Sequence, residues 1–269
     1  MSQLANTSRA TACRLLAQED PSPVEVVNRS GASPVLLLCE HAGRAVPASL
    51  AQLGLEPCEM EKHIAWDIGA AATARHLAAL LGAPLVLQAY SRLVIDANRP
   101  LSAPDCIPDI SDGVLIPGNT GLDTDARIQR FEEIHKPLHD TVAALLDQRK
   151  ADGRPGVLVT IHSFTPHFGG QDRAMAVGLL FNRDSRLAEA LRDALAEIVS
   201  DHTVVLNAPY AVDDVGDYAI PVHGEQRGIP HVLIELRNDL IDDEAGQERW
   251  AAYVYEALNI ALTRLEISQ

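Results

Sequence analysis

Residues 35–47 read VLLLCEHAGRAVP, an aliphatic run that stops abruptly at Glu40 and His41. A short, unbroken apolar run is typical of a strand that is buried on both faces of a parallel sheet. The small residues Ala42 and Gly43 follow, and small residues allow the backbone to come close to another group. The stretch therefore predicts a buried strand that ends in reactive side chains with open space beside them.

Further apolar runs alternate with helical patterns along the chain. This alternation implies a mostly parallel sheet covered on both faces, which is a three-layer α/β/α fold. Residues 84–100 fit either two short strands or one strand and an extended loop, while 101–122 form a long loop of the kind that is often functional. The expected strands lie within 35–40, 156–164, 176–183, 203–210 and 231–241, and the expected helices within 66–82, 124–153 with a bend at Pro137, 185–201 and 242–267.

The 269-residue chain is 47% apolar but only 4% aromatic, so its core must be built from Ala, Leu, Val and Ile. We expect a single domain over residues 1–269, in which 1–32 form a lead-in of a short helix and a loop. The net charge of −15 argues against nucleic-acid and membrane-surface partners, since binding to phosphates needs a basic face. No apolar run reaches the roughly 18 residues of a membrane span, and residues 1–23 lack the apolar segment of a signal peptide. The four scattered cysteines contain no CxxC pair, so we expect reduced thiols in a cytoplasmic protein.

Three of the expected buried strands end in side chains that can do chemistry. The first ends in His41, another in His162 and Ser163, and the last in Glu235 and Arg237. In open α/β sheets, ligands bind in the crevice beyond the carboxyl ends of the strands. We therefore expect these side chains to converge on one site.

Two neutral imidazoles and one carboxylate form a common ligand set for catalytic zinc, which leaves a position open for water. Zinc lowers the pKa of its bound water to about 7, and a carboxylate that does not bind the metal can take up the proton. His41 and His162 supply the imidazoles, while Asp67 and Glu235 offer the two carboxylates. Glu40 is another possible ligand, although strand alternation would send it to the face opposite His41. Plainer interpretations exist, since strand-end histidines often only meet solvent and Asp67 could simply cap a helix.

The polar residues Arg92, Asp96, Asn98 and Arg99 are packed into one short segment. Guanidinium groups bind carboxylates in bidentate fashion, so two arginines beside a metal site suit a substrate that carries carboxylates. Asn98 can donate to the same group, whereas Asp96 is more simply explained by an ion pair with an arginine. His167 and His223 lie in Gly-containing loops near strand ends. The histidines that we expect in solvated positions are His63, His76, His135, His139, His202 and His231.

The segments LLCEHAG, WDIGA, SRLVIDANRP, TIHSFTP and IPHVLIELRNDLI occur in the same order as in the N-formylglutamate amidohydrolase family, which the chain resembles from about residue 35 to 241. The resemblance implies a phosphorylase/hydrolase-like α/β/α fold with a mixed, mostly parallel sheet, related to the zinc carboxypeptidases. It implies metal-dependent cleavage of an N-acyl amide on an acidic amino acid, with N-formyl-L-glutamate of histidine degradation as the namesake substrate. The alternatives are a carboxypeptidase-like metallopeptidase and a catalytically silent small-molecule binding protein on the same scaffold.

The resemblance also implies roles for individual residues. The carboxypeptidase ligands look similar to His41 and His162, with Asp67 as the acid, displaced by an inserted segment. Their general base is a late strand-end glutamate, as Glu235 is, and their Asn–Arg pair for the substrate carboxylate looks similar to 98–99. We expect Zn²⁺ or another divalent metal and a small N-acyl amino acid as substrate, and the sequence leaves the oligomeric state open. The expected site consists of catalytic Glu235 and Arg237, metal ligands His41, Asp67 and His162, substrate-binding Arg92, Asn98, Arg99 and Ser163, and supporting residues Glu40, Asp96 and His223.

Overall fold

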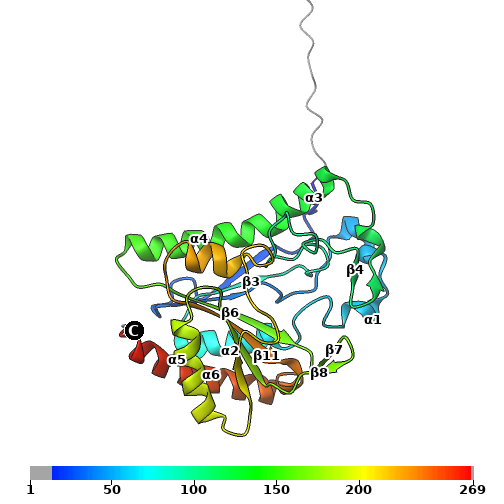
Figure 1. Cartoon of the computed structure of the whole chain (residues 1–269). Helices are drawn as coiled ribbons and strands as arrows, with labels where there is room; N and C mark the ends of the chain where they lie inside the picture. The colour runs from blue at the N-terminus through cyan, green and yellow to red at the C-terminus, as the bar shows by residue number, and fades with distance from the viewer. Residues whose placement is uncertain (1–13, 268–269) are drawn as a thin grey trace, which may run out of the picture.

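A seven-stranded sheet runs through the part of the chain that the computed structural model describes, residues 14–267 (Figure 1). In spatial order the strands are β1 (Val24–Val27), β3 (Leu85–Gln88), β2 (Val35–Cys39), β6 (Val157–Phe164), β11 (His231–Arg237), β9 (Val177–Leu180) and β10 (Val204–Leu206). The central strands β3, β2, β6 and β11 are parallel, while β1 runs antiparallel to β3 and β9 runs antiparallel to β11. The sheet is thus mixed and mostly parallel, as predicted.

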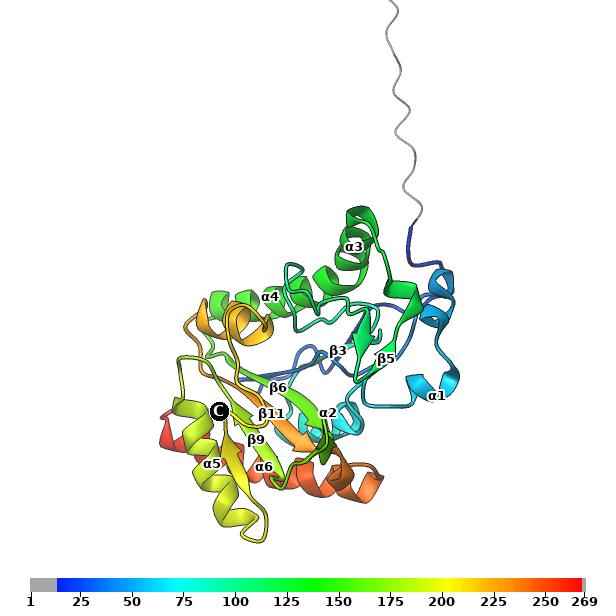
Figure 2. The ribbon, with the colours of Figure 1, turned by 45° about the vertical axis from the view of Figure 1, so that its right-hand side comes forward.

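Helices cover both faces of the sheet (Figure 2). Alternation along β2 sends Leu37 and Cys39 into the core on one face, and Leu36 and Leu38 into the core on the other. Both sets of side chains are buried, which explains why β2 is apolar throughout and confirms the three-layer prediction. One face is covered by α2 (Ala70–Leu81), α5 (Arg186–Ile198) and α6 (Glu244–Arg264), and the other by α4 (Lys136–Ala151) and the π-helical segment Ile220–Glu225.

An edge strand occupies part of the N-terminal region where we expected only a short helix and a loop. β1 pairs antiparallel with β3, and Val24 lies opposite Gln88. Residues 14–32 contain this strand and no helix, and the expected helix is not tested where it would fall within 1–13, which lie outside the described residues. A strand of four residues between prolines and polar residues carries too short a pattern to be distinguished from a loop.

Two small hairpins stand on the same side of the molecule, at the right of Figure 1. The expected loop 101–122 contains the hairpin of β4 (Ile110–Ser111) and β5 (Val114–Leu115), and the chain after β6 forms the hairpin of β7 (His167–Phe168) and β8 (Gln171–Asp172). Residues 84–100 form a single strand, β3, followed by an extended loop. The remaining short helical segments are η1 (Ala48–Gly54), α1 (Pro57–Met60), η2 (Pro117–Asn119) and η5 (Asn238–Leu240).

The long helix expected over 124–153 is interrupted by a wide turn. A π-helical turn at Phe131–His135 separates α3 (Thr124–Arg130) from α4, directly before Pro137. Pro137 lies in the first turn of α4, where its missing N–H costs nothing. The interruption was therefore predicted at the right place, but its form is an extra residue in one turn.

The structure shows the state of three of the four cysteines. Cys39, Cys58 and Cys106 are free thiols, as predicted, and Cys13 lies outside the described residues. Burial raises the pKa of the Cys106 thiol to about 12, which keeps it protonated and unreactive.

Across residues 14–267, no helix combines the length and the apolar composition that a bilayer-spanning segment needs.

Gly43 lies where two backbone segments come unusually close. A Cβ atom at this position would overlap the carbonyl group of Ala89, and the Ala45 N–H donates to that same carbonyl at 3.1 Å. The small residue thus admits the neighbouring chain after β3, whereas the sequence suggested space for a bound group beside His41.

A Gly43→Ala variant should lose about 1–3 kcal/mol of unfolding free energy, because the methyl group would force the two backbones apart. Urea denaturation measures this loss. Gly156→Ala is the control, because its Cβ would lie in ordinary contact, 3.7 Å from Leu146. Equal stability of the two variants would contradict the close-packing explanation.

Candidate active site

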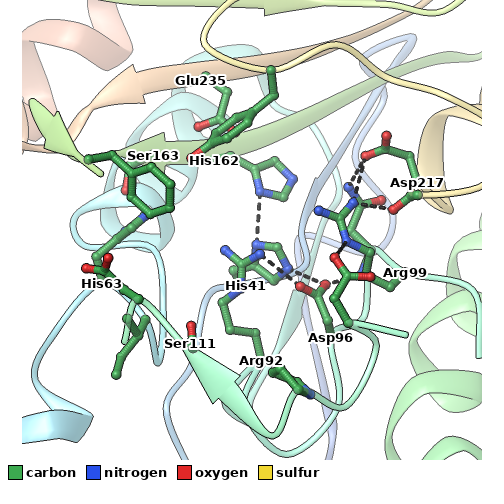
Figure 3. A pocket seen from close by; sticks show the side chains of 18 of the residues that line it. His41, His63, Arg92, Asp96, Arg99, Ser111, His162, Ser163, Asp217 and Glu235 are labelled. Carbon is green, nitrogen blue, oxygen red and sulfur yellow. Dashed lines mark hydrogen bonds and ion pairs between the residues drawn. The ribbon is translucent and has the colours of Figure 1, made fainter. Parts of the chain in front are cut away.

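A cavity of about 680 Å³ opens at the carboxyl ends of the central strands, where ligands bind in open α/β sheets (Figure 3). Glu235 of β11 lies directly beside His162 of β6 in the parallel register. His41 follows the end of β2, and its ring meets the His162 ring edge-on with centroids 4.9 Å apart. The structure thus brings together the three strand ends that the sequence singled out.

Asp67 completes a group of three donors with the two histidines. Its Oδ2 atom lies 3.0 Å from Nδ1 of His162 and 3.4 Å from Nδ1 of His41, and the two ring nitrogens are 3.2 Å apart. These atoms all lie within 4.8 Å of one another, close enough to hold one metal ion. Two imidazole nitrogens and a carboxylate oxygen are the donor set of catalytic zinc, so the residues fit a divalent cation.

Asp67 lies before the helix in which we expected it. Helix α2 begins at Ala70, with Gly69 before it at a φ of 80°, so Asp67 precedes the helix and does not cap it. Instead its backbone N–H donates to the carbonyl of His41 at 3.0 Å. Its carboxylate also accepts the N–H of Ser163 at 3.2 Å. Backbone contacts with both histidine-bearing segments therefore fix the carboxylate in place.

A second carboxylate faces the far nitrogen of each histidine. Nε2 of His41 lies 2.7 Å from Oδ1 of Asp96. Nε2 of His162 lies 3.0 Å from Oε2 of Glu40, within ion-pair distance but without the alignment of a hydrogen bond. Histidines that bind metals almost always place a carboxylate, carbonyl or water at the other nitrogen, which fixes the ring and raises its basicity. Glu40 thus lies behind His162, on the side away from Asp67.

Buried carboxylates give the two histidines an environment that favours positive charge. Burial acts to lower the pKa of His41, but Asp96 and Asp67 outweigh it, and the pKa is raised. The same competition raises the pKa of His162, where Glu40 and Asp67 outweigh burial. Burial acts to raise the pKa of Asp67, yet the two imidazoles hold it well below its usual range. The site is therefore built to stabilise a cation between these groups.

Glu235 is the carboxylate of the site that lacks a counter-charge at hydrogen-bond distance. It is only 7% exposed, and its Oε2 atom has no hydrogen-bond partner among the described residues. Burial raises its pKa to about 7. A carboxylate with such a pKa can both accept and return a proton near neutral pH.

Arg92 contacts the protein's own carboxylates. Its Nη1 donates to Oδ1 of Asp67 at 3.3 Å, and its Nη2 donates to Oδ2 of Asp96 at 2.8 Å. Arg92 therefore orients the two acids that face the histidines, and it lines the cavity. The ion pair that the sequence suggested for Asp96 is present.

Asn98 and Arg99 are similarly engaged. The Asn98 amide donates to Asp217 at 3.2 Å, and its carbonyl accepts the N–H groups of residues 218 and 219. Arg99 donates to Asp105 at 3.0 Å and contacts Asp217 at 3.4 Å. Both residues line the cavity, as Figure 3 shows for Arg99, but they connect its wall to the loop 213–219.

Of the remaining predicted residues, Ser163 lines the cavity, whereas Arg237 and His223 do not. Ser163 lines the cavity and donates through Oγ to the carbonyl of Ile68 at 2.8 Å. Arg237, expected to stabilise an oxyanion or orient Glu235, instead donates to Asp239 at 2.7 Å and is not among the lining residues. His223 is buried in the π-helical segment, also outside the cavity wall.

Several histidines that we expected in solvated positions are buried. His135 and His139 donate through Nε2 to the carbonyls of Arg99 and Ala97, at 2.9 and 2.7 Å. Nδ1 of His139 then accepts from Nε2 of His223 at 3.0 Å. These histidines hold the backbone on both sides of residue 98, and their four-residue spacing on one helix face was the available sequence signal.

His63 and His231 also depart from the solvated positions that we expected. His63 lines the cavity, with Nδ1 3.8 Å from Asp67, and burial lowers its pKa to about 4. His231 is 1% exposed at the start of β11. The predictions for both were wrong, because neither a loop position nor a strand start reveals burial by neighbouring segments.

A family model for N-formylglutamate amidohydrolase matches residues 33–242. The chain belongs to the N-formylglutamate amidohydrolase family. It is therefore a hydrolase that acts on carbon–nitrogen amide bonds, and family membership implies a small-molecule substrate. The resemblance inferred from five short segments is thus confirmed over most of the chain.

The solved structures similar to this chain include two that match it over nearly its whole length. Gene product Atu2144 from Agrobacterium tumefaciens is 40% identical, with a TM-score of 0.90 over 94% of this chain and 100% of that one. N-formylglutamate amidohydrolase from Ralstonia eutropha JMP134 is 18% identical, with a TM-score of 0.62 over 91% of this chain and 99% of that one, and shares the fold. No curated protein matches the chain.

The buried His135 should make the protein less stable in acid. Burial lowers the pKa of His135 from 6.5 to about 4. Between these pH values the imidazole is therefore protonated in the unfolded chain but neutral in the folded chain. Unfolding free energy should fall as the pH drops from about 6.5 toward 4, and His135→Gln should make this fall shallower by about 1.4 kcal/mol per pH unit. Urea denaturation at several pH values tests this, with the exposed His167→Gln as the control. An unchanged slope in His135→Gln would contradict it.

Proposed function

We propose that this protein is a metal-dependent amidohydrolase that cleaves the N-acyl amide of a small amino acid, with N-formyl-L-glutamate as the first candidate substrate. The observation that carries the proposal is the convergence of two histidine nitrogens and one aspartate oxygen on a single point beside an unpaired buried glutamate. His41, Asp67 and His162 would hold Zn²⁺ or another divalent metal. Family membership supports amide hydrolysis as the reaction.

The residues of the chain divide the chemistry among them. When bound, a divalent cation supplies Lewis acidity toward water and the acyl carbonyl. Glu235 accepts the proton of the attacking water at its carboxylate and returns it to the nitrogen of the leaving amine. Glu40 and Asp96 lie against Nε2 of His162 and His41, which would leave both Nδ1 atoms available to hold the cation.

A release assay tests the proposal. Purified protein is given N-formyl, N-acetyl and N-succinyl derivatives of Glu, Asp, Gln and His, with added zinc and after chelation. We expect release of the free amino acid from at least one derivative, loss of that release on chelation and recovery with zinc. Unchanged hydrolysis after removal of the metal would overturn the mechanism, and cleavage of unblocked dipeptides alone would point to a peptidase.

Glu235→Gln should keep the fold and the bound metal but lower kcat by about 100- to 10,000-fold, because it removes the proton acceptor with little change in volume. Steady-state kinetics, metal content and thermal unfolding measure the three properties. A variant that retains kcat within about tenfold of wild type would assign the proton transfer to another group.

Matched variants of the two candidate acids separate the metal ligand from the supporting residue. Glu40→Gln should weaken zinc binding by about 10- to 100-fold, since Glu40 acts through His162. Asp67→Asn should weaken it further, because the change removes a donor oxygen. Competition with a chelator of known affinity measures both, and the reverse order would make Glu40 the acidic ligand.

A further inference from the structure

One arginine beside the cavity wall has no acidic partner among residues 14–267. Arg173 follows β8, and its backbone N–H donates to the carbonyl of Pro166 at 2.7 Å. Among the described residues, no carboxylate forms an ion pair with its guanidinium, and its Nη1 atom is buried without a hydrogen-bond partner. A buried guanidinium nitrogen that makes no hydrogen bond is costly unless something binds to it.

Aromatic rings hold this guanidinium in place. Its central carbon lies 4.7 Å from the ring centroid of Phe168, 4.9 Å from that of Tyr210 and 5.9 Å from that of Phe164. Ring faces attract a guanidinium but do not neutralise it, and they satisfy none of its N–H donors, which remain able to bind a planar anion. In a chain with only 4% aromatic residues, three rings around one arginine form a built site.

The other two arginines of the site differ in this respect. Arg92 is matched by Asp67 and Asp96, and Arg99 by Asp105 and Asp217. Their charges are balanced within the protein, and their donors are occupied. A substrate carboxylate would have to displace a protein carboxylate to reach either one.

Arg173 lies within electrostatic reach of the cavity. Two of its rings, Phe168 and Tyr210, line the cavity, as does Thr165 at the start of the same turn. His63, on the cavity wall, has a pKa lowered chiefly by burial, and the charge of Arg173 contributes to that lowering. Arg173 is not itself a lining residue, but its guanidinium packs against two rings that are, directly beside the cavity that holds His41, Asp67 and His162.

We propose that Arg173, packed beside the cavity wall formed by Phe168 and Tyr210, binds a carboxylate of the substrate and thereby selects N-acyl amino acids that carry a free acid on that side. This inference rests on the proposed function, because every N-acyl amino acid has an α-carboxylate and an acidic one has a second. The shared chemistry is a planar carboxylate that faces the guanidinium fork. The amidated substrate that loses more activity shows whether Arg173 binds the α-carboxylate or the side-chain carboxylate.

Kinetics on amidated substrates provide the test. N-formyl-L-glutamate is compared with its α-amide and with N-formyl-L-glutamine, in which one carboxylate at a time is neutral. For wild type, amidation of the bound carboxylate should lower kcat/KM by about 10- to 100-fold, the usual loss for a hydrogen bond to a charged group. Arg173→Gln should cause a similar loss on N-formyl-L-glutamate, mainly through KM, and no further loss on the sensitive amide.

Two further variants control this test. Arg173→Lys keeps the charge but loses the fork, so its KM should lie between those of wild type and Arg173→Gln. Arg192→Gln removes an exposed arginine that pairs with Asp193 on α5, and it should behave as wild type. If Arg173→Gln loses the same factor on all three substrates, or none, the inference is overturned.

Binding measured without turnover separates this inference from the proposed function. Calorimetry on Glu235→Gln and on the Glu235→Gln/Arg173→Gln double variant should show a preference for the free carboxylate only in the first. That result, together with a wild-type protein that hydrolyses none of the three compounds, would support Arg173 and overturn the amidohydrolase proposal. Zinc-dependent hydrolysis by the wild-type protein, with the same carboxylate preference in the binding of both variants, would do the reverse. No binding of any of the three compounds and no hydrolysis of them would overturn both.

Discussion

Compensation of buried charge at the carboxyl end of the sheet is the constraint on which the rest of the structure depends. An ionised carboxylate removed from water costs several kcal/mol unless charges or hydrogen bonds surround it. Asp67 and Asp96 meet this condition by sharing Arg92 and by facing the two imidazoles. Because each acid has several partners, the loss of one would leave the others with uncompensated charge. The network is therefore a unit, fixed in geometry before any ligand enters.

A separate apolar cluster explains how this network is carried to the sheet. Leu53, Met60, Ala65 and Tyr90 belong to a group of buried residues distinct from the two cores on the sheet faces. This cluster packs together the segments before Asp67 and after β3, which the sequence presents only as an insertion and an extended loop. It gives the acidic residues a rigid support on the open side of the sheet. The site is thus assembled from strand ends on one side and from a small satellite core on the other.

Strand periodicity in the sequence predicts the parts of the site that lie on strands. His41, His162 and Glu235 end continuous apolar runs, and parallel strands necessarily bring such ends together. Asp67 was nominated correctly as a neighbour of these residues, but its local structure was not predicted, because it lies three residues before α2 begins and not within the helix expected over 66–82. Its position depends on a backbone contact with His41, and a sequence carries no direct signal for contacts of that kind. For the same reason the sequence did not reveal the close contact between Gly43 and Ala89 or the aromatic rings around Arg173. Residues distant in the chain create both.

The π-helical turn Phe131–His135 sets the angular phase of the long helical rod. One additional residue in a turn rotates the following side chains by about 100° relative to those before it. On one side of the turn, Arg130 is buried and donates to the carbonyls of Val94 and Gly118; on the other, Leu138 packs against the sheet. The two halves of the rod can therefore pack against two different surfaces, the loop residues around Val94 and Gly118 on one side and the sheet on the other. The backbone around Asn98 is consequently tied to the same rod, because His135 and His139 donate to the carbonyls on either side of it. A shift of this part of the wall would therefore disturb the helix that packs against the sheet.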